Sequence, residues 1–385
     1  MKNFNEHDLT RDAYMLHGPL ARNGYDWWWH NFTGHNKETG EEKSFFVEYF
    51  IINPALAEEE PVLGQLPENQ RLHRKPSYLM IKAGTWGEDA RQLHRFFPMK
   101  DVEVSHGAPY HISARNARGQ QVAVASDVHI AGNIRVTRED AHGHPEWMCD
   151  AGRMKWDLEV DKQIAFNVGY GASKPLRDAD SFAMYWHVEG MKTAYRGSVF
   201  LDGTEYVVDP ETCYGYADKN WGSDFTSPWV WLSSCDLTSR LSGKKLRNSA
   251  FDIGGGCPKV YFVPLPRELL GAFWYEGKPY EFNFSKFWTK PTTVFDCREE
   301  EDQVVWTVTQ QNRTALMKTN VFCQKKDMLL VNYEAPDGQK RHNHLWNGGT
   351  GMGRIQLYEK VAGGLHLIDD MIAEHVGCEY GEYDR

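Results

Sequence analysis

Residues Ser181 to Asp236 read SFAMYWHVEGMKTAYRGSVFLDGTEYVVDPETCYGYADKNWGSDFTSPWVWLSSCD. Short runs of β-branched and aromatic residues alternate here with Gly, Pro, Asn and Asp, a pattern typical of strands joined by turns. We predict strands at Ser181 to Val188, Ala194 to Leu201 and Val230 to Cys235. The segment therefore favours an antiparallel β architecture.

The same pattern continues on both sides of this segment, whereas helical apolar spacing is scarce. Only Glu88 to Phe96 and the segment near Met371 to His375 are predicted to be helical. We expect an all-β sandwich or barrel. The further predicted strands are Ser44 to Ile52, Tyr78 to Ala83, Tyr110 to Ala114, Gln121 to Ser126, Lys155 to Val160, Ile164 to Gly169, Lys259 to Val263, Tyr280 to Phe284, Val304 to Thr309, Leu316 to Cys323, Met328 to Tyr333, Arg354 to Glu359 and Leu365 to Asp369.

The chain length indicates more than one structural unit, because 385 residues exceed what a single hydrophobic core usually serves. The segment Gly169 to Asp180 (GYGASKPLRDAD) replaces the strand pattern with glycine, proline and charge, which predicts a crossover loop. We therefore place a boundary near residue 175 and predict two halves, residues 1–175 and 176–385. No internal repeat is visible in the sequence.

Composition and charge exclude several classes of protein. The net charge is −10 and the basic residues are scattered without a stripe, so nucleic acid is not an expected partner. No apolar run approaches the roughly 20 residues that span a bilayer, and Met1 to Thr10 is polar, which predicts a cytoplasmic protein without a transmembrane segment. The seven cysteines are odd in number and form no CxxC pair, so neither a disulfide framework nor a zinc knuckle is expected.

Two glycine clusters resemble nucleotide-binding loops only superficially. Gly254 to Gly256 lacks the GK[ST] of a P-loop, and Asn347 to Gly353 (NGGTGMG) precedes a strand-like stretch where a phosphate loop needs a helix. We predict tight hairpin turns at both places and no nucleotide cofactor.

Metal and nucleophile signatures are weak. Two histidine pairs have the spacing that puts both rings on one face of a strand, but each lies in a polar, turn-rich stretch without a third ligand. We therefore expect solvated histidines and no metal. No GxSxG or HExxH motif occurs either, which leaves these hydrolase classes unsupported. The pairs are His142 with His144 and His342 with His344.

One motif in the first segment carries a resemblance to a known family. Tyr216 to Gly222 (YADKNWG), followed by Pro228 to Trp231 (PWVW), resembles the signature of the tocopherol cyclases and of their carotenoid hydratase relatives, which include hydroxyneurosporene synthase and AttH-like proteins. The ends of the chain are similar to that family's opening hairpin and closing strands, whereas the intervening loops match poorly. These end segments are Asp26 to Phe32 (DWWWHNF), Phe45 to Pro54 (FFVEYFIINP), Gly353 to Lys360 (GRIQLYEK) and Gly377 to Gly381 (GCEYG).

The resemblance implies two lipocalin-like β-barrel halves around an apolar pocket. It also implies chemistry that begins by protonating an alkene, after which a ring closes or water adds, without any cofactor. The expected substrate is a hydrophobic unsaturated small molecule such as a prenylated phenol, terpenoid or polyketide, and the enzyme would be a cyclase, isomerase or hydro-lyase. Tocopherol itself is doubtful as the product, because the chain lacks a transit segment and Arg341 to Trp346 (RHNHLW) has no counterpart in the family.

The residues of the motif fit such chemistry. Protonating carbon needs an acid held away from water, and a carboxyl group in an aromatic cavity keeps its proton because its pKa is raised. We predict that Asp218 is the proton donor, with Tyr216 and Asn220 on the same side of an extended strand. The related hydratases use a histidine and a tryptophan on the preceding strand. His187 is the matching catalytic candidate, and Trp186 lies one register step away.

The other predicted contacts are aromatic or polar side chains of the same motifs, since aromatic faces stabilise a developing cation. The predicted substrate-binding residues are Trp28, Glu48, Trp186, Asn220, Trp221, Trp229 and Trp231.

Four alternatives stay open at this point. Asp218 could instead close a barrel corner in an Asx turn, and Trp27 to Trp29 could be ordinary core. The whole protein could be a carrier that holds a lipid or pigment without chemistry, because fold alone does not specify function. A redox enzyme is the least supported alternative. A carboxyl or histidine facing apolar pocket walls would favour the enzyme over the carrier.

Overall fold

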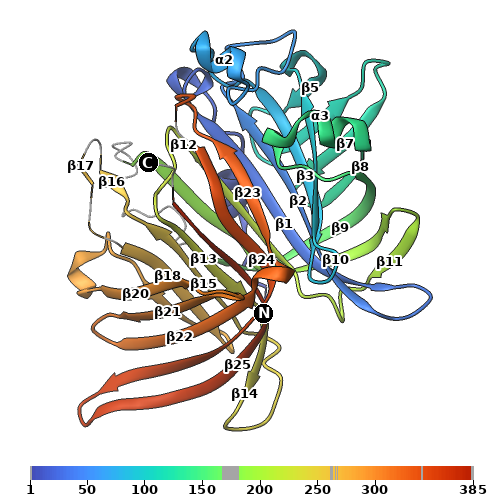
Figure 1. Cartoon of the computed structure of the whole chain (residues 1–385). Helices are drawn as coiled ribbons and strands as arrows, with labels where there is room; N and C mark the ends of the chain where they lie inside the picture. Colours follow the sequence, from blue (N-terminus) through green and yellow to red (C-terminus); the bar gives the residue numbers. More distant parts are fainter. Residues whose placement is uncertain are drawn as a thin grey trace.

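The structure is a computed structural model that describes residues 2–166, 182–260, 263–264, 266, 268–339 and 341–382. Strands dominate these ranges and pair antiparallel with their neighbours. Figure 1 shows two strongly curved sheets that lie against each other. The predicted all-β, lipocalin-like fold class is confirmed.

The first sheet is 12-stranded and curls into a barrel. Its strands follow the order β4-β3-β2-β1-β11-β10-β9-β8-β7-β6-β5, and β12 pairs with both β1 and β10. The strands are β1 (Tyr25–Asn36), β2 (Glu42–Ile52), β3 (Tyr78–Trp86), β4 (Arg91–Phe97), β5 (Val102–Val104), β6 (His111–Arg115), β7 (Gln121–Ser126), β8 (His129–Val136), β9 (Gly152–Phe166), β10 (Met184–Leu201), β11 (Thr204–Val208) and β12 (Tyr216–Gly222).

The second sheet is 11-stranded and follows the order β19-β18-β15-β13-β25-β24-β22-β21-β20, with β14 paired to β25 and β23 to β24. A separate hairpin joins β16 (Lys259–Val260) to β17 (Val263–Pro264). The strands of the second sheet are β13 (Trp229–Ser234), β14 (Asp236–Ser239), β15 (Ala250–Gly256), β18 (Glu268–Tyr275), β19 (Lys278–Phe282), β20 (Thr292–Glu299), β21 (Gln303–Gln311), β22 (Ala315–Gln324), β23 (Leu329–Glu334), β24 (Arg341–Val361) and β25 (Gly364–Gly381).

Helices are short and lie at the ends or in connections. None of those described is long and apolar enough to cross a membrane. They are α1 (Glu6–Asp12), α2 (Pro67–Arg71), α3 (Arg138–Gly143) and the 3-10 turns η1 (Gly18–Ala21), η2 (Met99–Asp101), η3 (Pro145–Trp147), η5 (Phe287–Thr289) and η6 (Lys325–Asp327).

Three apolar clusters account for most of the core. One fills the barrel of the first sheet and includes Trp28 and Trp156, and another lies within the second sheet around Trp306. The third draws side chains from both sheets, among them Trp29 of β1 and Trp231 of β13. We call this third group the inter-sheet cluster. It results from the alternation of side chains along each strand, which gives both sheets a second apolar face.

The predicted helices are both wrong. Residues Arg91–Phe97 form β4, which pairs with β3 and buries Leu93 and Phe97. The segment from Met371 to His375 belongs to β25, between β24 and β14. In both places pairing with a neighbouring strand overrides local spacing that suggested a helix.

The glycine clusters predicted to be hairpin turns lie inside strands β15 and β24 instead. Their glycines make room for indole rings. A Cβ on Gly254 would lie 2.8 Å from the ring of Trp186, and one on Gly349 would lie 2.1 Å from the ring of Trp86. These positions need glycine because an aromatic side chain occupies the space beside the backbone.

The predicted boundary near residue 175 falls in a stretch outside the described residues, as does the predicted crossover loop from 169 to 180. Strands β10, β11 and β12 follow that stretch in sequence and belong to the first sheet. The division into halves 1–175 and 176–385 stays a prediction.

An ion cluster at His375 ties the two sheets together. Its Nδ1 lies 2.6 Å from Asp236 of β14, and its Nε2 lies 2.6 Å from Glu42 of β2. The ring also stacks on Tyr214 at 4.6 Å. Although burial opposes the charge, hydrogen bonds to the two carboxylates raise the pKa of His375 to about 9. The imidazolium form therefore joins the sheets at neutral pH.

We expect this cluster to make stability depend on alkaline pH. The pKa of His375 rises from an ordinary 6.5 to about 9 on folding. The stabilisation is therefore complete below about pH 6.5 and is lost as the pH rises through about 9, a total of about 3 kcal/mol. Urea unfolding of wild type between about pH 6 and pH 10 should show this decline, and His375→Gln should flatten it.

The matched control is His35→Gln, because His35 also approaches Glu42, at 3.5 Å, but contacts no second carboxylate among the described residues. The decline should persist in this variant. An equal flattening in both variants would contradict the assignment to His375.

Candidate functional site

Strand β12 carries the YADKNWG motif into the middle of the molecule. It pairs with β1, where Trp29 lies opposite Asp218, and with β10, where Trp186 lies opposite Asn220. Asp218 therefore lies within a strand, and its hydrogen bonds come from side chains rather than from the backbone of a turn. The Asx-turn alternative does not describe this residue.

Alternation along β12 separates two sets of side chains. Tyr216 and Asp218 point toward the second sheet, as the sequence predicts for one face of an extended strand. Lys219 points the other way, into the barrel, where it pairs with Asp26 and lies 3.8 Å from the ring centre of Trp28. The strand thus presents its carboxyl group to the inter-sheet cluster.

A small cavity lies in this cluster, with walls from both sheets. Its volume is about 20 Å³, enough for one water molecule. Four indoles, one phenol and two carboxyl groups make up its lining, a combination of aromatic faces and acids. The lining residues are Trp27, Trp29, Asp218, Trp229, Trp231, Tyr333 and Glu379.

Asp218 is held by two donors on the same oxygen. Trp186 Nε1 donates to Oδ2 at 2.6 Å, and the Tyr216 hydroxyl donates to Oδ2 at 3.1 Å. Oδ1 accepts no hydrogen bond from the described residues, so it is the oxygen available to the cavity. Trp231 Nε1 in turn donates to the Tyr216 hydroxyl at 3.2 Å, which fixes the phenol.

Burial is the main influence on the ionisation of Asp218. It raises the pKa of this carboxyl well above the usual 3.8, and the nearby Glu379 adds to the rise, whereas the bonds from Trp186 and Tyr216 oppose it. The shift therefore favours the protonated form of this carboxyl group. Because Oδ2 already accepts two hydrogen bonds, the proton belongs on Oδ1.

Glu379 enters the same cavity from β25. Trp229 Nε1 donates to its Oε2 at 2.5 Å, and the Asn347 amide donates to its Oε1 at 2.5 Å. Burial raises the pKa of Glu379 to about 7, although these two bonds lower it. This carboxyl group can therefore exist in either protonation state near neutral pH.

A buried ion pair lies behind Tyr333. The Tyr333 hydroxyl donates to Glu48 Oε2 at 2.9 Å, and Lys82 Nζ lies 3.1 Å from the same oxygen. The ammonium group of Lys82 is also 3.7 Å from the centre of the Tyr333 ring. Glu48 thus positions a wall of the cavity without lining it.

The structure brings most of the predicted site residues together. Asp218, Trp229 and Trp231 line the cavity, while Tyr216 and Trp186 bind Asp218. Glu48 supports the cavity through Tyr333, and the side chain of Asn220 accepts a hydrogen bond from Tyr25 at 2.7 Å.

Three predicted residues lie elsewhere, because each points to the opposite face of its strand. Trp28 belongs to the barrel core and Trp221 to a separate cluster with Tyr185. His187 lies inside the barrel, with Nε2 3.4 Å from Asp12 and 3.6 Å from Asp8. The structure therefore does not bring His187 to Asp218, and Trp186 takes the place beside the acid.

Sequence reasoning missed four lining residues: Trp27, Trp29, Tyr333 and Glu379. A signal for Glu379 exists in the alternation of GCEYG, since Gly377 shares its face and leaves room for Trp231, whose ring a Cβ would meet at 2.2 Å. Trp27 and Trp29 lie within the segment DWWWHNF, but the prediction chose Trp28, which is one residue away and points to the opposite face of the strand.

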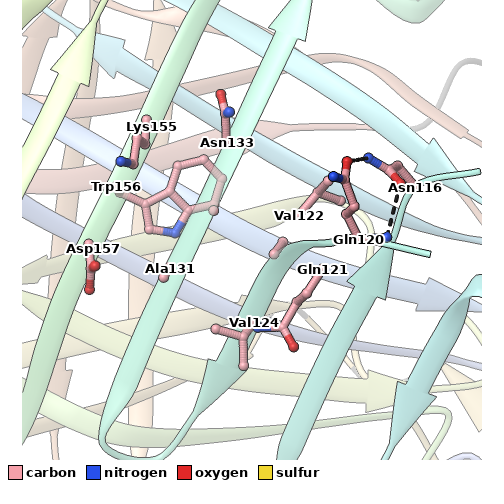
Figure 2. A pocket seen from close by; sticks show the side chains of 12 residues that line it. Asn116, Gln120, Gln121, Val122, Val124, Ala131, Asn133, Lys155, Trp156 and Asp157 are labelled. Carbon is pink, nitrogen blue, oxygen red and sulfur yellow. Dashed lines mark hydrogen bonds between the residues drawn. The ribbon is translucent and has the colours of Figure 1, made fainter. Parts of the chain in front are cut away.

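A larger hollow lies on the outside of the first sheet. It has a volume of about 480 Å³ and opens where β7 and β8 diverge, as Figure 2 shows. Of its described lining residues, only Asp157 carries a carboxyl group, and this group is exposed and lies 2.9 Å from His129. The hollow therefore lacks the buried acid that the smaller cavity has.

A cluster of carboxylates inside the barrel has the spacing of a metal site. Asp12, Asp127 and Glu189 approach one another closely, but Lys162 Nζ already contacts all three at 2.9, 2.8 and 2.7 Å. The ammonium group occupies the position that an ion would need.

No protein-family profile and no curated protein sequence matches the chain. Among solved structures, CghA is similar at 10% identity over 94% of this chain and 90% of its own, with a TM-score of 0.49. Kievitone hydratase from Nectria haematococca is 11% identical over 95% and 90%, with a TM-score of 0.45. An AttH-like protein from Nitrosomonas europaea is 10% identical over 93% and 92%, with a TM-score of 0.42. At these values the likeness says nothing about substrate or reaction, which must come from the site.

Proposed function

We propose that this protein is a cofactor-independent acid catalyst that protonates a carbon–carbon double bond in a hydrophobic unsaturated small molecule. Prenylated phenols, terpenoids and polyketides have the required chemistry, and the product would arise by cyclisation, isomerisation or hydration. The observation that carries the proposal is the buried Asp218 carboxyl group in an indole-lined cavity, with both of its donors on Oδ2.

The first step uses this arrangement directly. The proton on Oδ1 of Asp218 passes to an alkene carbon, and the π electrons form the new carbon–hydrogen bond. Asp218 becomes a carboxylate, whose charge strengthens the hydrogen bonds from Trp186 and Tyr216. The same two donors therefore stabilise the conjugate base as it forms, which lowers the barrier.

The carbocation that results lies among aromatic faces. Trp27, Trp29 and Trp231 line the cavity with Trp229, and the quadrupole of an indole attracts a cation by about 0.5 to 2 kcal/mol for each ring. The cavity of about 20 Å³ is too small for such a substrate, so substrate entry must displace a wall. Trp27 is the partly exposed wall.

The carrier remains the alternative, and it differs in one requirement. A carrier needs apolar walls but has no use for a buried carboxyl group with two donors behind it. Chemistry in heavy water separates the two, because only a catalyst forms a new carbon–deuterium bond.

The decisive experiment starts with the ligand. Native mass spectrometry of protein purified from its own host should reveal an apolar molecule, which is then incubated with enzyme in deuterated water beside a panel of prenylated phenols and terpenoids. We expect deuterium on carbon in the product with wild type and none with Asp218→Asn. A bound ligand that is recovered unchanged and unlabelled would support the carrier.

A second expectation concerns the tryptophans that line the cavity. Trp231→Leu should weaken binding of the co-purifying ligand by about tenfold, because the indole lines the cavity and its loss removes apolar contact. Trp221→Leu is the matched control. Trp221 is similarly buried, but it lies on the face of β12 that points away from the cavity. Titration calorimetry measures both, and equal losses would contradict the placement of the ligand.

A further inference from the structure

Glu379 and Asp218 face one cavity from different sheets. Asp218 lies on β12 of the first sheet and Glu379 on β25 of the second, where it is opposite Trp231 of β13 and Asn347 of β24. The proton donor of the proposed reaction thus has a second carboxyl group within the same water-sized space. A reaction that begins with proton donation to carbon also needs a group that takes a proton away.

The hydrogen bonds of the two acids differ in a way that suits opposite roles. Both donors to Asp218 end on Oδ2, which leaves Oδ1 to carry a proton. Glu379 receives one N–H donor on each oxygen, from Trp229 and from Asn347. Two donors on two oxygens match an ionised carboxylate, which only accepts hydrogen bonds.

The donors to Glu379 are themselves held in place. The oxygen of the Asn347 side chain accepts a hydrogen bond from Trp86 Nε1 at 2.8 Å, so its amide nitrogen must face Glu379. The backbone carbonyl of Glu379 accepts a hydrogen bond from Trp306 Nε1 at 3.0 Å, which fixes the strand at this residue. Side chains from both sheets therefore fix the position of the Glu379 carboxylate.

We propose that Glu379 is the base of the reaction, which accepts a proton from the water that adds to the carbocation or from a carbon next to it. This inference rests on the proposed function. It identifies the group that removes a proton after Asp218 has donated one. Glu379 would touch the reacting atoms, whereas Asn347 and Trp229 are positioning residues.

The number of protons on the enzyme is the same before and after one catalytic cycle. Asp218 gives a proton to the alkene carbon, and the oxygen of water supplies the electron pair of the new carbon–oxygen bond. Glu379 then takes a proton from that oxygen, which leaves a neutral alcohol. In an isomerisation Glu379 instead takes a proton from the adjacent carbon, and the electrons of that bond form the new alkene. Transfer of the proton from Glu379 to Asp218 through a water in the cavity restores the starting state.

The charged and titratable groups around Glu379 come from strands of both sheets. Asp218 of β12, Glu48 of β2 and Tyr333 of β23 are acids, and Lys82 of β3 is the cation. Lys82 favours the carboxylate, whereas Glu48 opposes it. The protonation of Glu379 therefore depends on this set as a whole, and a test must isolate it from the others.

A cationic probe tests the base without knowledge of the substrate. Dodecyltrimethylammonium imitates an alkyl cation, and dodecanol is its neutral counterpart. If the cation binds against an ionised Glu379, its affinity for wild type should rise about tenfold between about pH 6 and pH 8, as the ionised fraction grows. The affinity for dodecanol should stay constant. Calorimetric titration measures both.

Two variants locate the effect. Glu379→Gln keeps the shape and should abolish the rise, and Glu374→Gln, a half-exposed position on the same strand, should retain it. A rise that survives in Glu379→Gln would overturn the assignment of the base and leave the proposed function intact. Failure of wild type to bind either probe would overturn both. Circular dichroism of each variant establishes that the fold is kept.

Discussion

Asp218→Asn should lower turnover by at least about 10²-fold, the usual scale for loss of a general acid. The amide has the shape of the neutral carboxyl group, so its carbonyl oxygen can accept the hydrogen bonds of Trp186 and Tyr216. Its NH₂ group would then face the cavity in place of the acidic hydroxyl, and an amide does not protonate carbon. Steady-state kinetics on the ligand identified from the native host, with product analysis in deuterated water, measures the effect.

Binding and folding should survive this change. Burial already favours the neutral form of Asp218, so a neutral replacement of the same shape suits this site. Thermal unfolding should therefore stay within a few degrees of wild type, and ligand affinity should stay within a few-fold. Full activity in the variant would remove Asp218 from the mechanism, and an unfolded variant would show that its role is structural.

Lys162→Met should produce the largest loss of stability, about 3 to 5 kcal/mol, because it leaves buried carboxylates without their cation. Lys162 lies fully inside the barrel and contacts Asp12 of α1, Asp127 after β7 and Glu189 of β10. It therefore joins the amino-terminal helix to the barrel wall. Urea unfolding at neutral pH measures the loss, with Lys155→Met as control, since Lys155 is exposed on the same strand.

The dependence of this loss on pH identifies its cause. Burial already raises the pKa of Asp12 beside Lys162, and loss of the ammonium group should raise it further. The penalty is then larger at neutral pH and shrinks as the pH falls and this carboxyl group takes up a proton. A deficit that stays constant between about pH 7 and pH 5 would indicate lost packing of the lysine stem instead.

Local sequence was sufficient to predict the fold class and the part of the site that β12 contributes. Alternation of apolar residues depends only on neighbours two positions apart, and it predicted β2, β3 and β7 at nearly their observed bounds. The same rule put Tyr216 and Asp218 on one face of a strand, which the structure confirms.

The phase of each strand relative to its neighbours was decided by tertiary structure. A strand with two apolar faces reads the same in either phase, so the sequence could not show that Trp27 and Trp29 face the cavity while Trp28 faces the barrel. The choice of Trp186 over His187 beside Asp218 has the same origin.

Contacts between the sheets could not be predicted from the sequence either. Glu379 and Asp218, more than 150 positions apart in the chain, line one cavity only because the second sheet packs against the first. Gly254 looked like a turn because the Trp186 ring that requires it comes from another sheet. Alternation specifies which residues share a face, but the residues that meet across a cavity depend on how two curved sheets pack, and this information is not local.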